Sequence, residues 1–156
     1  YGSCYNPSHN IKFSSYCGVC IQNEIRMFLR KEKIDLISNK EMLKKICDAG
    51  RFTKHYSPLK IVVCGNTSKA LPLNLKEYWV QDCSASIENI LLGVTDMGLG
   101  ACWEGVYPQK IFTKKLSELL ELPKTHIPLA VLSIGYPDED PEPRDQYDEK
   151  KIHYIK

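Results

Sequence analysis

The chain has 156 residues and a formal net charge of +2, with 26% charged and 43% hydrophobic residues. We expect one domain, residues 1–156, because a chain of this length can bury a core of its own. The basic residues are scattered, which argues against a nucleic-acid partner. No apolar run approaches the ~18 residues that span a membrane, so no membrane partner is expected either.

Residues 1–33 show little periodicity: the first part has the composition of a loop, and residues 19–29 fit a short helix. Residues 34–38 form a short apolar run that predicts a strand. Asn39 then offers a helix N-cap for residues 40–48. One side of that helix is apolar, through Met42, Leu43 and Ile46.

Residues 59–65, LKIVVCG, have the β-branched run of a buried strand. A long helix follows, with Tyr78 and Trp79 just before it as core or interface anchors. Its apolar stripe predicts a face packed on a core, and we expect Gly98 and Gly100 to end it. A short strand-like run, residues 101–103, then leads into a loop at Glu104. The apolar stripe of the long helix consists of Val80, Cys83, Ile87, Ile90, Leu91, Val94 and Met97.

Residues 109–121 repeat a helical pattern, which Pro123 closes. Residues 127–134, IPLAVLSI, predict a third buried strand, and the remaining tail is charged and interrupted by prolines. Helices that alternate with buried strands indicate an α/β or α+β sandwich. The apolar positions of the helix predicted at residues 109–121 are Ile111, Leu116, Leu119 and Leu120.

The seven cysteines are odd in number and spread along the chain. Four lie in or beside apolar runs, where a free cysteine behaves as a small buried hydrophobe. No secretory signal is visible, and a start at Tyr1 rather than Met leaves room for residues upstream. We therefore expect a reduced, cytoplasmic protein rather than a disulfide scaffold. The four cysteines in or beside apolar runs are Cys47, Cys64, Cys83 and Cys102.

The string DCSASIENILL…GLGACWEGVYP resembles the central segment of the FMN-dependent nitroreductase family, and the likeness extends over residues 40–156. It implies an α+β fold, a three-layer α/β/α sandwich around a central, mostly antiparallel sheet. It also implies a homodimer that binds FMN in the subunit interface, with the central helix against its mate. Electrons would pass from NADH or NADPH to a nitroaromatic, a quinone or a similar acceptor. The cofactor carries that chemistry, so no catalytic side chain is expected.

The resemblance also implies which residues hold the cofactor. Trp103, Glu104 and Gly105 would lie beside the flavin, with backbone N–H groups of the last two facing its N5/O4 edge, where fixed dipoles stabilise charge. Arg144, in the tail, would grip the phosphate as a cationic fork. The family's second basic position is Gln146 here, which puts phosphate affinity in doubt.

The family's N-terminal signature is only partly present. Residues 6–10, Asn-Pro-Ser-His-Asn, resemble the start of a loop against the flavin ring, which makes Ser8 and Asn10 candidates for cofactor binding. The Gln-Pro-Trp that should follow is missing. A degenerate, non-catalytic flavin-binding relative is therefore the alternative function.

A third interpretation is a metal or redox-thiol module. Cys17-Gly-Val-Cys20 has the spacing of a metal or thiol-exchange pair, and Cys4 and His9 could complete a ligand set. Nothing else in the spacing is characteristic of such a site, so we expect no metal.

Overall fold

The computed structural model describes residues 32–50, 56–72, 75–139, 142, 145 and 147–155. The predicted helix at residues 19–29 lies outside this part of the chain. The described elements are β1 (Glu32–Ile37), α2 (Lys40–Ala49), β2 (Leu59–Asn66), α3 (Tyr78–Asp96), β3 (Gly100–Gly105), α4 (Lys110–Leu119), β4 (His126–Gly135) and the short 3-10 helix η2 (Glu149–Lys151).

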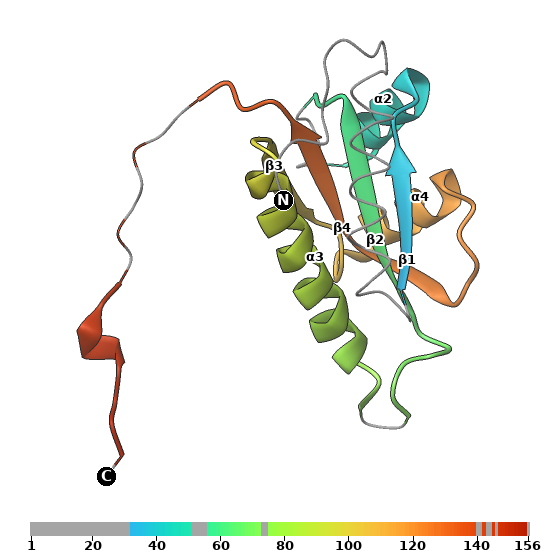
Figure 1. The fold of residues 1–156 in the computed structure, drawn as a ribbon. Helices are drawn as coiled ribbons and strands as arrows, with labels where there is room; N and C mark the ends of the chain where they lie inside the picture. The colour runs from blue at the N-terminus through green and yellow to red at the C-terminus, as the bar shows by residue number, and fades with distance from the viewer. Residues whose placement is uncertain are drawn as a thin grey trace.

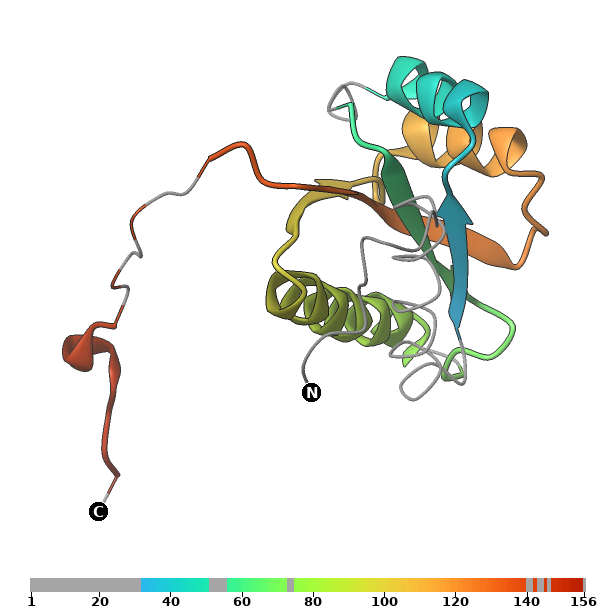
Figure 2. The ribbon, with the colours of Figure 1, turned by 45° about the horizontal axis from the view of Figure 1, so that its top comes forward.

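The four strands form one antiparallel sheet in the order β1-β2-β4-β3. Helix α3 lies along one face of this sheet, and α2 and α4 lie together on the other (Figure 1). Figure 2 shows the three layers edge-on, with the sheet in the middle. The predicted α+β sandwich with a mostly antiparallel sheet is thus confirmed.

The core between α3 and the sheet confirms the predicted stripe. Because successive side chains of a strand point to opposite faces, Ile61 and Val63 of β2 meet α3 while Val62 does not. The helix begins earlier than expected, since Tyr78 and Trp79 already belong to it. The buried stripe of α3 comprises Trp79, Cys83, Ser86, Ile87, Ile90 and Val94.

A second core lies between the sheet and the pair α2 and α4. The cap predicted for α2 is present: Asn39 Oδ1 accepts from the N–H groups of Glu41 and Met42, at 2.9 and 3.1 Å. In α4 the predicted apolar face is confirmed at Leu116, Leu119 and Leu120, which pack on the core, and is wrong at Ile111. Ile111 is 77% exposed, and Phe112, one turn before Leu116, points into the core instead.

Gly98 ends α3 as predicted, because its φ of 71° is the left-handed conformation of a helix C-terminus. Its N–H donates to the carbonyl of Thr95 at 2.9 Å. The same prediction for Gly100 is wrong, since Gly100 is the first residue of β3. The loop predicted at Glu104 is wrong as well, because pairing with β4 keeps the chain extended as far as Gly105.

Beyond β4 the chain leaves the sheet and runs away from the three layers (Figure 1). Its aromatic and aliphatic side chains are exposed there, among them Tyr147, Tyr154 and Ile155. Among the described residues, no helix is long and apolar enough to cross a bilayer.

Candidate functional site

Strand β3 carries the candidate site, in residues 103–105. It is an edge strand, because β4 lies on one side of it and no described strand lies on the other. Trp103 is 41% exposed and Gly105 is exposed, whereas Glu104 between them is only 3% exposed. This 103–105 stretch therefore presents a backbone and an indole to the surface and a carboxylate to the interior.

Gly105 leaves open space beside the strand. A Cβ built on it would meet no atom of the described residues within 4 Å. The N–H groups of Val106 and Tyr107 both donate to the carbonyl of Leu129, at 2.9 and 3.0 Å. Because backbone groups alternate in direction along an antiparallel strand, the N–H of Gly105 points away from β4. A backbone donor with free space next to it is what a flat ligand needs in order to approach closely.

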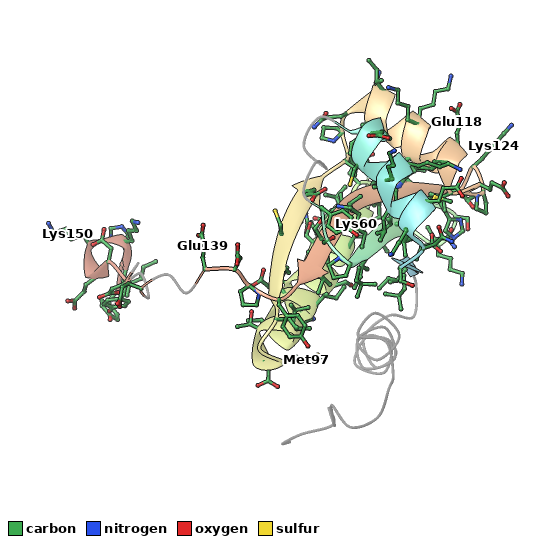
Figure 3. All side chains as sticks on the ribbon, turned by 90° about the horizontal axis from the view of Figure 1, so that it is seen from above. Lys60, Met97, Glu118, Lys124, Glu139 and Lys150 are labelled. Carbon is green, nitrogen blue, oxygen red and sulfur yellow. The ribbon has the colours of Figure 1, made fainter. Side chains whose placement is uncertain are left out.

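Glu104 belongs to a buried polar cluster with Lys60 of β2 and Ser133 of β4. Lys60 Nζ donates to Ser133 Oγ, and Ser133 Oγ donates to Glu104 Oε1 at 2.6 Å. Lys60 Nζ lies 3.5 Å from the same carboxylate oxygen. The other oxygen, Glu104 Oε2, is buried without a hydrogen-bond partner among the described residues. Figure 3 labels Lys60 amid the packed side chains of the body.

The segment after β3 is tied to the start of α3. The rings of Tyr107 and Trp79 meet edge to face, with centroids 4.9 Å apart. Tyr107 Oη donates to Glu77 Oε2 at 3.0 Å, and this bond to a carboxylate raises the pKa of Tyr107. The end of β3 is therefore held from both sides, by β4 and by the N-terminus of α3.

Comparison with known proteins gives this site its context. Residues 61–136 match the family model described as "Nitroreductase family". The chain is 37% identical, over 123 residues, to an Archaeoglobus fulgidus protein with the provisional name NADH dehydrogenase/NAD(P)H nitroreductase. The match covers 76% of this chain and 70% of that protein. The chain belongs to the nitroreductase family.

A Methanothermobacter thermautotrophicus member with the same provisional name is 39% identical over 124 residues. The match covers 78% of this chain and 63% of that relative's length. A solved Clostridium difficile structure described as an FMN-dependent nitroreductase superposes with a TM-score of 0.79 at 24% identity, over 93% of this chain and 90% of that chain. That likeness is one of fold.

The described residues fit the ring side of the flavin site that the nitroreductase resemblance implies. The open space at Gly105 and the exposed indole of Trp103 leave room for a planar group beside β3. The candidates for the rest of the site, Ser8, Asn10 and Arg144, lie outside the described residues, as does Gln146.

The metal alternative involves Cys4, His9, Cys17 and Cys20, all outside the described residues. Within the described part of the nitroreductase chain, no group of three or more His, Cys, Asp or Glu side chains could hold a metal ion. Cys64 and Cys83 are buried, as predicted, whereas Cys102 on β3 is exposed.

Lys60 and Ser133 were not among the residues predicted from the sequence. A signal was present, because Lys60 interrupts the apolar run of β2 and Ser133 interrupts that of β4. A single lysine inside a buried strand is unusual enough to indicate a buried partner. Which residue that partner is, 44 or 73 positions away, cannot be read from the run itself.

Proposed function

We propose that this nitroreductase-family chain is an FMN-dependent oxidoreductase. It would pass electrons from NADH or NADPH to a nitroaromatic, a quinone or a similar small acceptor in the cytoplasm. The observation that carries the proposal is the open space beside the backbone of Gly105. Gly105 belongs to the 103–105 stretch, where the family resemblance predicts the flavin. The provisional names of two relatives and the FMN dependence stated for the C. difficile protein point the same way.

Bound FMN would supply the redox chemistry, because the isoalloxazine ring accepts and releases hydride. The chain's own residues bind and orient. The N–H of Gly105 would be a fixed donor to the ring, because a backbone dipole stabilises charge without titrating. Trp103 offers an exposed aromatic surface for packing. Ser8, Asn10 and Arg144 remain the proposed contacts for the ring and the phosphate.

The proposal includes a homodimer. Helix α3 buries one stripe in its own core, yet Leu92, on its outer side, is 61% exposed. Tyr78, at its start, is also exposed. These apolar side chains suit a helix that packs against its mate, with the flavin at the interface between two copies.

The test is the substitution Gly105→Val, followed by titration of the purified protein with FMN. The valine methyls would occupy the open space, so we expect FMN affinity to fall by about tenfold or more, the effect of ~1–3 kcal/mol of overpacking. Folding should survive, because the position is extended and a Cβ there meets no atom of the part of the chain that the structure describes. Quenching of flavin fluorescence gives the affinity, and urea unfolding checks the fold.

Ala101→Val is the matched control. Ala101 is exposed on the same strand and the same face, four residues or ~13 Å away. It should bind FMN like the parent chain. A parent chain that takes up no FMN contradicts the proposal. A chain that binds FMN but is not reduced by NADH or NADPH supports the degenerate, non-catalytic alternative instead.

A further inference from the structure

The least expected side chain of the core is Lys60. Its exposed fraction is 0%, although lysine is almost never fully buried unless it is paired. It pairs with Ile37 of β1 and with Ser133 of β4. It points to the same face as Val62, the face that α2 and α4 cover. A buried ammonium is costly to desolvate, so the contacts of Lys60 must offset that cost.

One series of contacts runs from Lys60 across the sheet to β3. From β2 the contacts pass to Ser133 on β4 and end at Glu104 on β3. Ser133 accepts from the ammonium and donates to the carboxylate, so its single hydroxyl fixes both groups. The ion pair itself, at 3.5 Å, sets the positive charge of Lys60 against the negative charge of Glu104.

The cluster ends directly behind the candidate site. Glu104 is the middle residue of the 103–105 stretch, so its backbone is bonded to both Trp103 and Gly105. Its side chain enters the interior while its neighbours face the surface. Any change in the charge of this cluster therefore occurs one residue away from the backbone donor of Gly105, in a water-excluded region where charges act strongly.

We propose that Lys60 and Ser133 are positioning residues that hold the Glu104 carboxylate and neutralise it behind the flavin-facing strand, and so set how tightly the site holds reduced relative to oxidised FMN. The inference rests on the proposed FMN function. Reduced flavin carries extra negative charge near the ring edge, so an unbalanced charge behind that edge favours one oxidation state over the other.

The experiment removes the positive charge of Lys60 and the negative charge of Glu104, first separately and then together. Lys60→Met leaves the carboxylate without its counter-ion, so the ratio of reduced to oxidised FMN affinity should fall about tenfold. Glu104→Gln leaves the ammonium unbalanced and should raise the same ratio. The double variant Lys60→Met/Glu104→Gln is neutral again and should return near the parent value. The ratio follows from the reduction potential of the bound flavin, in which a tenfold change is ~30 mV for two electrons.

Two further variants sharpen the result. Ser133→Ala removes the bridge but no charge, so it should loosen FMN binding with a smaller change in the ratio. Lys114→Met breaks an exposed ion pair with Glu118 on α4 and should leave the ratio unchanged. Opposite shifts for the two single charge variants support the proposal, because loss of structure alone would move both in the same direction.

Shifts of the same sign, or no shift in any of the folded charge variants, overturn the positioning role while leaving the proposed function standing. A parent chain that binds no FMN overturns both, and it is detected in the first titration. If Lys60→Met does not fold, Glu104→Gln and the double variant still decide between the two outcomes, since each lacks the unpaired buried carboxylate.

Discussion

Gly65 and Trp79 illustrate how closely single residues are fitted in this core. A Cβ placed on Gly65 would lie 2.2 Å from Cε3 of the Trp79 ring, far inside van der Waals contact. The ring cannot easily retreat, because Trp79 is buried and Tyr107 contacts it edge to face. The glycine is needed here for space rather than for its backbone conformation.

Gly65→Ala should therefore destabilise the chain by ~1–3 kcal/mol through overpacking. Urea unfolding measures the change. Gly105→Ala is the matched control, because a Cβ there contacts none of the described residues and its effect should stay within ~0.5 kcal/mol. Equal effects of the two alanines would show that the contact with Trp79 does not limit this position.

At the scale of elements, the segment after β3 is attached to the start of α3. Glu77 is the N-cap residue of α3 but makes no side-chain capping bond. Its carboxylate instead accepts from Tyr107 Oη. That bond exists only while the phenol is protonated, and it raises the pKa of Tyr107 in the folded chain. The contact is largely exposed, so its contribution is small.

Tyr107→Phe keeps the ring contact with Trp79 but removes the bond. A raised pKa in the folded chain means that the bond contributes fully below the unfolded pKa of about 10 and is lost as pH rises through the folded pKa. We expect the parent to be more stable by ~0.5 kcal/mol near pH 7, with the difference narrowing above about pH 10.

Urea unfolding of both proteins from pH 7 to 11 tests this dependence. Tyr56→Phe, at an exposed tyrosine, serves as the control and should show no difference at any pH. A difference between the parent and Tyr107→Phe that does not change with pH would remove the carboxylate bond as its cause.

At the scale of the whole molecule, the two helical layers differ in what they leave exposed. The layer of α2 and α4 covers the face that holds the buried polar cluster, and α3 covers the other. Leu92 of α3 is exposed on the side away from the sheet, as is Ile111 of α4 on the opposite layer. The proposed dimer uses the α3 side alone. Substitutions at Leu92 and Ile111 therefore distinguish an interface on the α3 side from one on the opposite layer.

Leu92→Asp should dissociate the proposed dimer. A two-fold interface would bury the new carboxylate twice, and several kcal/mol per buried ion weakens association more than a hundredfold. Ile111→Asp should leave it intact. Analytical ultracentrifugation over a range of concentrations measures both. A parent chain that is monomeric throughout, or equal dissociation by the two variants, contradicts the proposed interface.

The local features of this fold follow from local patterns. The stripe of α3, the Asn39 cap and the apolar runs of β2 and β4 depend on residues within a few positions of one another. The first core position of α4 did not follow, because Ile111 and Phe112 are both apolar and only packing against the sheet selects Phe112. The extension of β3 through Glu104 likewise depends on pairing with a strand that comes later in the chain.

The candidate site divides in the same way. The sequence by itself determined the family resemblance and marked residues 103–105 as candidate cofactor contacts, because the string GLGACWEGVYP is contiguous. The cofactor role of these residues stays a prediction. Only the tertiary structure decided that Glu104 turns inward and meets Ser133 and Lys60. Those partners lie 29 and 44 positions away, and sheet register, which depends on the pairing of whole strands, is what brings them together.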